Sequence, residues 1–225
     1  MLITIDGLDG SGKETLSRRL VDTLKYKTNK EIYYLSFPDY SNSSGLLSYG
    51  LLHVNRFSTI GAGEAKFLYA VPGNRRRYFM SELFAINRHE LFLNQPMKPD
   101  GIYIADRYAK SNLLYQGKDD PNPEVFAKYL TELEYVDYNN PQADLSFFLH
   151  VPYEVLRERL DKRDELDLYE QDDSLKNTYD FSEMLIHSYK AFEYVIEGTK
   201  DGQAIPVDTI INEQMLPIIL ERVAK

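Results

Sequence analysis

GLDGSGKET, from Gly7 to Thr15, is the stretch that decides the fold of this 225-residue chain. It follows a short apolar run and precedes a segment of helical periodicity, so we predict a strand, a glycine-rich turn and a helix. Such a turn directs several backbone N–H groups, and the positive end of the helix dipole, at one point. Lys13 would add a positive charge for the outer phosphates. The stretch predicts a nucleotide-phosphate site formed by Gly7, Leu8, Asp9, Gly10, Ser11, Gly12, Lys13, Glu14 and Thr15.

Glu14 stands where the strict pattern has a serine or threonine whose hydroxyl helps to hold Mg²⁺. Three interpretations stay open: Glu14 turns outward in the first helical turn, it reaches the metal directly or through water, or the site is inactive. Thr15 offers a hydroxyl about 100° further round the helix, where it would meet a different phosphate. Other carboxylates would then have to support the metal.

Short apolar runs alternate with longer segments of helical periodicity, which is typical of helices around a parallel sheet. We predict five strands, at Leu2–Asp6, Ile32–Phe37, Ile102–Asp106, Leu145–Val151 and Gln203–Asp208. Two helix faces should cover this sheet, one with Leu16, Leu20 and Leu24 and one with Val125, Tyr129, Leu130 and Leu133. A third, with Leu216, Ile219, Leu220 and Val223, predicts a docked C-terminal helix. Between the second and third strands, glycines over Ser41–Arg77 predict short helices and loops.

Composition limits the classes of function. The length favours one α/β domain over residues 1–225. The net charge of −9 gives no general attraction for a nucleic acid polymer or an acidic membrane, so any phosphate must be held locally. The chain has no cysteine, which excludes disulfides and thiolate metal sites. Without a signal peptide or a membrane-length apolar run, we expect a soluble cytoplasmic protein.

The segment DRYAKSNLLYQG, from Asp106 to Gly117, follows the third predicted strand. A carboxylate and an arginine at the C-terminal end of a parallel strand should lie beside the phosphate loop, where ligands bind in such sheets. Arg107 can form two hydrogen bonds to a phosphate, and Asp106 can reach metal-bound water. Such a pair is also common as a structural ion pair.

Together these segments resemble the thymidylate kinases, P-loop nucleoside monophosphate kinases that make dTDP from dTMP and ATP. The resemblance implies their three-layer fold, a five-stranded parallel sheet flanked by helices. GLDGSGKET is similar to the family's phosphate loop, and DRYAKSNLLYQG to its Asp-Arg-Tyr motif. FPDY (Phe37–Tyr40) resembles its Phe-Pro segment, and ELFAINRHE (Glu82–Glu90) its helix with a base-stacking phenylalanine and an arginine four residues later.

The resemblance implies specific roles. Lys13 would hold the ATP phosphates, Mg²⁺ would bridge them with Asp9 and Asp106 nearby, and Arg107 would bind the acceptor phosphate. Asp9 would contact the sugar 3′-OH or metal-bound water, and Tyr115 would favour deoxyribose. Phe84 would stack on thymine, while Arg88 and Asn112 would hydrogen-bond its edge. The implied acceptor site comprises Phe37, Pro38, Tyr40, Phe84, Arg88, Arg107, Asn112, Tyr115 and Gln116, and the implied assembly is a homodimer.

KRDELDLYE (Lys162–Glu170) resembles the family's mobile lid, placed here at about 161–176. The family's arginine after the Asp is replaced by Leu168. Arg163, Lys162 and Arg159 remain as candidates for the lid cation, and we take Arg163 as the catalytic one. Asp39 is a second departure, at a position where the family often has an arginine for the acceptor phosphate. The basic run at Arg75–Arg77 would either compensate or simply begin an exposed helix.

Two other functions compete. A deoxynucleoside kinase must deprotonate a 5′-OH and needs a carboxylate after the second strand, where Asp39 stands. The chain could instead be a nucleotide-binding module without catalytic activity. Glu14, Asp39 and Leu168 would then reflect the loss of that activity. The phosphate of dTMP, with a second pKa of about 6, needs no general base. This suits a sequence in which none of His53, His89, His150 and His187 falls in a matched motif.

Overall fold

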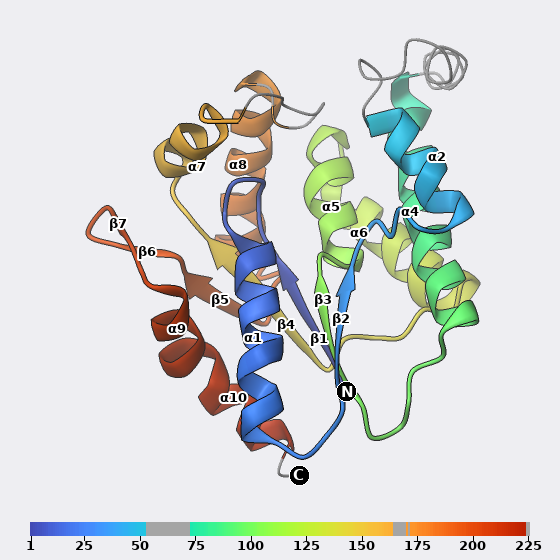
Figure 1. Cartoon of the computed structure of the whole chain (residues 1–225). Coiled ribbons are helices and arrows are strands. Elements are labelled where there is room, and N and C mark those ends of the chain that lie inside the picture. The colour runs from blue at the N-terminus through green and yellow to red at the C-terminus, as the bar shows by residue number, and fades with distance from the viewer. Residues whose placement is uncertain (53–72, 164–169, 171, 224–225) are drawn as a thin grey trace.

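A five-stranded parallel sheet is the centre of the fold in the computed structural model, which describes residues 1–52, 73–163, 170 and 172–223. The strands lie in the order β2-β3-β1-β4-β5, and all neighbours are parallel. Helices cover both faces of the sheet (Figure 1), which confirms the predicted α/β architecture. The sheet strands are β1 (Leu2–Asp6), β2 (Ile32–Ser36), β3 (Ile102–Asp106), β4 (Leu145–His150) and β5 (Tyr194–Glu197).

The helices follow the alternation predicted from the sequence. Between β1 and β3 lie α1 (Lys13–Lys27), α2 (Ser43–Leu52) and α4 (Gly73–Asn94). Between β3 and β4 lie α5 (Ala109–Gln116), η2 (Gly117–Asp119), α6 (Pro123–Glu132) and the π-helix η3 (Leu133–Asp137). After β4 come α7 (Tyr153–Leu160) and α8 (Asp172–His187), and after β5 the hairpin β6–β7 (Thr199–Lys200, Gln203–Ala204), α9 (Val207–Thr209), η4 (Ile210–Met215) and α10 (Leu216–Val223). In this described part, no helix is long and apolar enough to cross a membrane.

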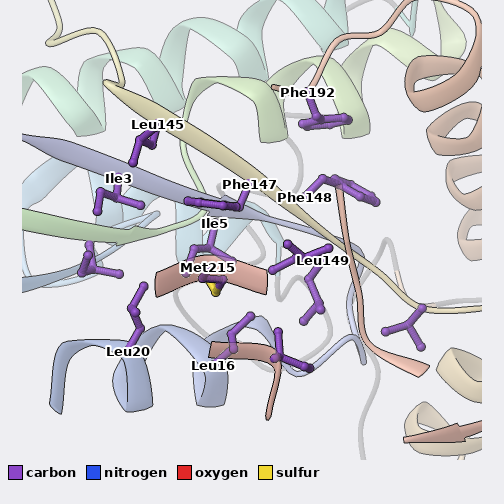
Figure 2. Packing of buried hydrophobic residues seen from close by; sticks show 14 of the residues in the cluster. Ile3, Ile5, Leu16, Leu20, Leu145, Phe147, Phe148, Leu149, Phe192 and Met215 are labelled. Carbon is purple, nitrogen blue, oxygen red and sulfur yellow. The ribbon is translucent and has the colours of Figure 1, made fainter. Parts of the chain in front are cut away.

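The central strands are buried along their whole length, as expected for a parallel sheet covered on both faces. On one face, Leu16 and Leu20 of α1 point at the strands beside Met215 of η4 (Figure 2). On the other face, Phe192 packs against Phe148 with ring centroids 4.4 Å apart. The predicted α1 face is confirmed, because Leu16, Leu20 and Leu24 are all buried. The C-terminal helix is docked through Leu216 and Ile219.

The fifth strand was predicted in the wrong place. The chain forms β5 at Tyr194–Glu197, whereas Gln203–Ala204 belongs to a small antiparallel hairpin and Val207–Thr209 to a helix. Pro206 explains the difference, because it has no N–H for a sheet and instead precedes the first turn of α9. The true strand lies at the sheet edge with Val195 39% exposed, so it shows no long apolar run.

The helix face predicted at Val125–Leu133 is corrected in part. Leu130 and Leu133 are buried as predicted, but Val125 is exposed and Phe126 is buried in its place. The buried residues pack with Ala85 of α4 rather than against the strands. The segment Ser41–Arg77 provides α2 and the start of α4, while Gly61, Gly63 and Pro72 lie outside the described residues.

Candidate active site

The phosphate loop joins the end of β1 to the start of α1, as predicted. Gly10 has φ 81° and Gly12 has φ 92°, in the left-handed region that favours glycine. A Cβ atom on Gly10 would also lie 3.2 Å from the Leu156 carbonyl oxygen, so α7 packs closely behind the loop. Gly12 is the N-cap of α1. The loop therefore presents the N-terminus of a 15-residue helix to the carboxyl edge of the sheet.

Lys13 is held inside this loop. Its Nζ atom donates hydrogen bonds to the Leu8 carbonyl oxygen and to Asp9 Oδ1, both at 3.2 Å. Burial and the nearby guanidinium of Arg107 lower the pKa of Lys13, and Asp9 opposes that shift. The Lys13 ammonium group is therefore buried beside the loop amides, where a phosphate would be placed, and its charged hydrogen-bond partner there is Asp9.

Asp9 connects the loop to the residues after β3. Its carboxylate accepts hydrogen bonds from Lys13, from Arg107 Nη2 and from the Tyr115 hydroxyl, the last at 2.9 Å. Burial alone would raise the pKa of Asp9, but Arg107 and Lys13 together hold it well below its ordinary value. One ionised carboxylate thus links the lysine of the phosphate loop to the arginine of the Asp-Arg-Tyr segment.

Arg107 occupies an unusual backbone conformation. Its φ of 65° lies in the left-handed region, which is uncommon for residues other than glycine and often marks a functional position. Its guanidinium lies over the ring of Tyr115, 5.1 Å from the centroid. Burial alone would lower the pKa of Arg107, but Asp9 raises it well above its ordinary value, so the side chain is permanently charged. The sharp turn after β3 thereby aims this charge across the sheet edge toward Asp9.

A pocket lies beside this cluster, and the structure brings the predicted acceptor-site residues together around it. All of them line it: Phe37, Pro38, Tyr40, Phe84, Arg88, Arg107, Asn112, Tyr115 and Gln116. Asp9, Leu52, Tyr108 and Ser111 complete the lining. Phe84 is only half-buried, so part of its side chain remains exposed. Asp9 and Arg107 therefore belong to both the phosphate loop cluster and the pocket.

The two carboxylates predicted to approach Mg²⁺ differ in their surroundings. Both oxygens of Asp9 are engaged by protein donors, whereas Oδ1 of Asp106 is buried with no hydrogen-bond partner in the described residues. Burial raises the pKa of Asp106, and Lys13 and Arg107 oppose the shift. The other oxygen of Asp106 accepts from the Tyr34 hydroxyl at 3.3 Å. Asp106 therefore fits a Mg²⁺ ion bound mainly by phosphate and water, as is usual for this metal.

Glu14 lies on the outside of α1. Its side chain is 64% exposed and accepts a hydrogen bond of 2.9 Å from Arg18 one turn later. This is the outward orientation, the first of the three interpretations. Thr15 is exposed as well. Within the described residues, no group of three or more acidic or histidine side chains could hold a metal ion.

The three lid cations occupy different environments. Arg159 of α7 donates to the carbonyl oxygens of Gly10 and Ser11 in the phosphate loop, at 3.0 and 2.9 Å. Arg163 is half exposed and pairs with Glu170, and Lys162 is exposed and pairs with Glu158. Of these, Arg159 is the one hydrogen-bonded to the loop, although we predicted Arg163 as the catalytic cation. Leu168 lies outside the described residues.

Asp39 is engaged in local structure. Its Oδ1 atom accepts from the backbone N–H and the hydroxyl of Ser41, at 3.0 and 2.7 Å. Asp39 is not among the described residues that line the pocket. In the basic run, Arg77 lies at the start of α4 with its Nε atom 2.7 Å from Asp120, and Arg75 is exposed. These arginines do not line the described pocket either.

Comparison with known proteins settles the family to which this site belongs. A family model described as thymidylate kinase matches residues 5–200. The chain belongs to the thymidylate kinase family. A probable thymidylate kinase of Thermoplasma acidophilum is 25% identical over 221 residues, which cover 93% of each chain. A thymidylate kinase of Plasmodium falciparum is 29% identical over 188 residues, covering 82% of this chain and 77% of the relative.

A solved structure agrees with the fold. The thymidylate kinase of Candida albicans superposes with a TM-score of 0.62 at 21% identity, covering 100% of this chain and 93% of that one. Membership of the thymidylate kinase family confirms the resemblance drawn from the motifs, and with it a phosphotransferase that acts on thymidylate.

Two residues of this thymidylate kinase site had no role predicted from the sequence: Glu134, which lies in none of the motifs, and Ser111, which lies in the Asp-Arg-Tyr segment. Glu134 of η3 is fully buried and accepts hydrogen bonds from Arg88, Asn112 and Asn140, so it stands directly behind the pocket. Ser111 lines the pocket and donates to the buried Asp6, 2.5 Å away. Glu134 lies in a polar segment with no motif, although three apolar neighbours at Leu130, Leu133 and Val136 could have indicated a partly buried turn.

Proposed function

We propose that the site transfers the γ-phosphate of ATP to dTMP, giving dTDP and ADP, with Mg²⁺ as the cofactor. The observation that carries this proposal is the Asp9 cluster. Lys13 in the phosphate loop and Arg107 at the pocket share one carboxylate oxygen of Asp9, so the donor and acceptor phosphates would meet beside this carboxylate. Positioning and charge neutralisation account for most of the catalysis in phosphoryl transfer.

On the donor side, the loop amides from Gly7 to Thr15 and the ammonium group of Lys13 would bind the ATP phosphates. Arg159 would fix the loop, because its guanidinium holds two of the loop carbonyl oxygens. Asp106 would hold water molecules bound to Mg²⁺. Asp9 would do the same once Lys13 and Arg107 donate to the phosphates instead of to its carboxylate. The metal would neutralise charge on the transferring phosphates. Arg163 would close over them from a mobile lid at about 161–176.

On the acceptor side, Arg107 would bind the dTMP phosphate and Tyr115 would lie against the deoxyribose. Phe84 would stack on thymine, with Arg88 and Asn112 along its edge. The remaining lining residues, Phe37, Pro38, Tyr40 and Gln116, would enclose the nucleotide. A phosphate monoester is mostly ionised at neutral pH and is itself the nucleophile, so the pocket needs no base.

The deoxynucleoside kinase alternative is disfavoured by the surroundings of Asp39. A general base must be within hydrogen-bond reach of the substrate hydroxyl, and this carboxylate is occupied by Ser41 outside the described pocket lining. A non-catalytic module is disfavoured by Arg107, since nucleotide binding alone gives no reason for a left-handed arginine aimed at the acceptor pocket. We further propose a single domain, a homodimer and a cytoplasmic location.

A coupled assay of ADP release tests the proposal with dTMP or thymidine as acceptor. Magnesium-dependent turnover of dTMP is expected, with thymidine a poor substrate. Light scattering after size-exclusion chromatography tests the homodimer separately.

A further inference from the structure

Glu134 is a carboxylate with no exposed surface, placed behind the two residues that would read the base. Its side chain accepts from Arg88 Nε at 3.0 Å and from Arg88 Nη2, and the arginine side chain is itself only 4% exposed. Asn112 Nδ2 donates to the same carboxylate at 3.3 Å, and Asn140 Nδ2 at 2.9 Å. Arg88 comes from α4, Asn112 from α5 and Glu134 from η3, so one carboxylate joins three elements.

The hydrogen bonds of Arg88 determine what it offers to the pocket. A guanidinium has five N–H donors in a fixed plane. Glu134 takes one on Nε and one on Nη2, which orients the plane and leaves the outer N–H groups, those on Nη1 above all, for another partner. Since Arg88 lines the pocket, those groups form a donor on its wall.

The hydrogen bonds of Asn112 leave it a hydrogen-bond acceptor to offer to the pocket, whereas Arg88 offers donors. Its Nδ2 atom donates to the Ser81 carbonyl oxygen at 3.2 Å and to Glu134, which accounts for both of its N–H groups. The amide orientation follows from this network, because neither of those oxygens could donate to Oδ1. The Oδ1 atom of Asn112 is then the group left for the pocket, as an acceptor.

A donor next to an acceptor matches one kind of pyrimidine edge. Thymine and uracil carry an acceptor at O4 and a donor at N3–H, whereas cytosine carries a donor at N4 and an acceptor at N3. We propose that Glu134 is a positioning residue that sets this polarity, and that it thereby favours thymidylate and deoxyuridylate over deoxycytidylate. The inference rests on the proposed function and deepens it.

Stability alone does not explain the cluster. A buried ion pair gains little over apolar residues of similar volume, because both charges lose their water. Glu134 also lies in a π-turn, in which the Tyr138 N–H bonds the Leu133 carbonyl oxygen at 3.1 Å, and such turns are frequent at functional sites. The Asn140 N–H closes the turn on the Glu134 carbonyl oxygen at 2.8 Å. The turn holds the carboxylate between Arg88 and Asn112.

The test is Glu134→Gln, assayed with dTMP, dUMP and dCMP under saturating ATP and Mg²⁺. A glutamine presents an N–H in place of one carboxylate oxygen, so Asn112 is free to reverse its amide. We expect KM for dTMP to rise about tenfold with kcat changed much less, since a misaligned buried donor or acceptor weakens binding by about that factor. We expect the ratio of kcat/KM for dTMP to that for dCMP to fall at least about fivefold, with dUMP following dTMP.

Glu90→Gln is the matched control. Glu90 lies on the same helix as Arg88 and accepts from the Ser44 hydroxyl at 2.6 Å, but does not line the described pocket, so the ratio should stay at the wild-type value. Because each ratio is taken on one preparation, loss of folded protein cancels. Should Glu134→Gln yield no folded protein, Glu134→Asp is read by the same criterion, since the shorter carboxylate cannot keep both partners aligned.

A second comparison separates a role through Asn112 from a merely structural one. In the Asn112→Ala background, Glu134→Gln should change the dTMP to dCMP ratio much less than in the wild type, because only its effect through Arg88 remains. Calorimetric titration of dTMP and dCMP without ATP gives the ratio of affinities independently of turnover. If the wild type binds dTMP but does not phosphorylate it, the proposed function is wrong. The role of Glu134 is then decided by comparing the ratio of dTMP to dCMP affinity in Glu134→Gln with that in the wild type. A ratio in Glu134→Gln within about fivefold of wild type overturns the inference.

Discussion

The Nζ atom of Lys13 lies 3.2 Å from the Oδ1 atom of Asp9, inside a loop whose Gly10 and Gly12 have left-handed backbones. Arg107 Nη2 donates to the same oxygen atom of Asp9. Two cations that would otherwise repel one another are thus held together by one carboxylate oxygen. The phosphoryl group would pass close to these cations, which makes Lys13, Arg107 and Asp9 the part of the site most sensitive to substitution.

Arg107→Ala should lower kcat/KM for dTMP by about 10³-fold, the usual magnitude for an arginine that stabilises a transferring phosphoryl group. The variant leaves Asp9 with Lys13 and Tyr115, so the fold should survive. Steady-state kinetics with dTMP varied measures the loss. Arg19→Ala is the control, since Arg19 is exposed and pairs with Asp208. A near-normal kcat/KM for Arg107→Ala would contradict the assignment of Arg107 to the acceptor phosphate.

Glu14→Ser should leave ATP binding and turnover within about threefold of wild type. The Glu14–Arg18 pair is exposed, and such pairs contribute less than about 1 kcal/mol. Turnover measured across a Mg²⁺ titration checks this. A collapse of activity with lost Mg²⁺ dependence would show that Glu14 is a metal ligand after all.

Arg159→Ala should raise KM for ATP about tenfold while KM for dTMP changes little. Its two hydrogen bonds hold carbonyl oxygens of the phosphate loop, and each unmade bond of this kind costs about 1 kcal/mol. Arg163→Ala should behave differently, with a fall in kcat at nearly constant KM for ATP. Two-substrate kinetics on both variants makes the comparison. Equal effects on KM for ATP would contradict the separate roles assigned to these arginines.

Asp6→Asn should change how stability depends on pH. Asp6 is fully buried, and burial raises its pKa although Ser111 and the Tyr108 N–H oppose the shift. A carboxyl whose folded pKa lies above its unfolded value of 3.8 contributes stability when protonated, and that contribution is lost as pH rises through the folded pKa. Urea unfolding over a pH series from 7 down to about 4, just above the unfolded value, should therefore show the stability of the wild type increasing relative to that of Asp6→Asn as the pH falls. A constant difference would mean that the pKa of Asp6 is not raised.

β1, β3 and β4 could be predicted from the sequence because they are buried and read as continuous apolar runs. β2 is a half-buried edge strand, but its sequence IYYLS is still a run of mostly apolar and aromatic residues. β1 and β3 were placed at their observed ends, and β2 and β4 to within one residue. β5 could not be found in this way, since an edge strand with an exposed Val195 has only a short apolar pattern. The longer segment around Pro206 was predicted in its place.

Most of the pocket lining could be predicted because it belongs to motifs that resemble the family, in segments that follow β2 and β3 and within α4. Leu52 lies outside those motifs and was not predicted. Glu134 could not be predicted, because its role depends on a π-turn that brings it to Arg88 and Asn112 from 46 and 22 positions away in the sequence. The hydrogen bond from Arg159 to the phosphate loop was not predictable either, because it depends on the packing of α7 behind Gly10. Such contacts are set by tertiary structure and leave no periodic signal.

The coupled assay that compares dTMP with thymidine is the most direct test of the reaction. With ATP and Mg²⁺ present, we predict that kcat/KM for dTMP exceeds that for thymidine by at least about 100-fold, because thymidine leaves Arg107 without its phosphate partner. ADP release that is faster with thymidine, or absent with dTMP, would contradict the account.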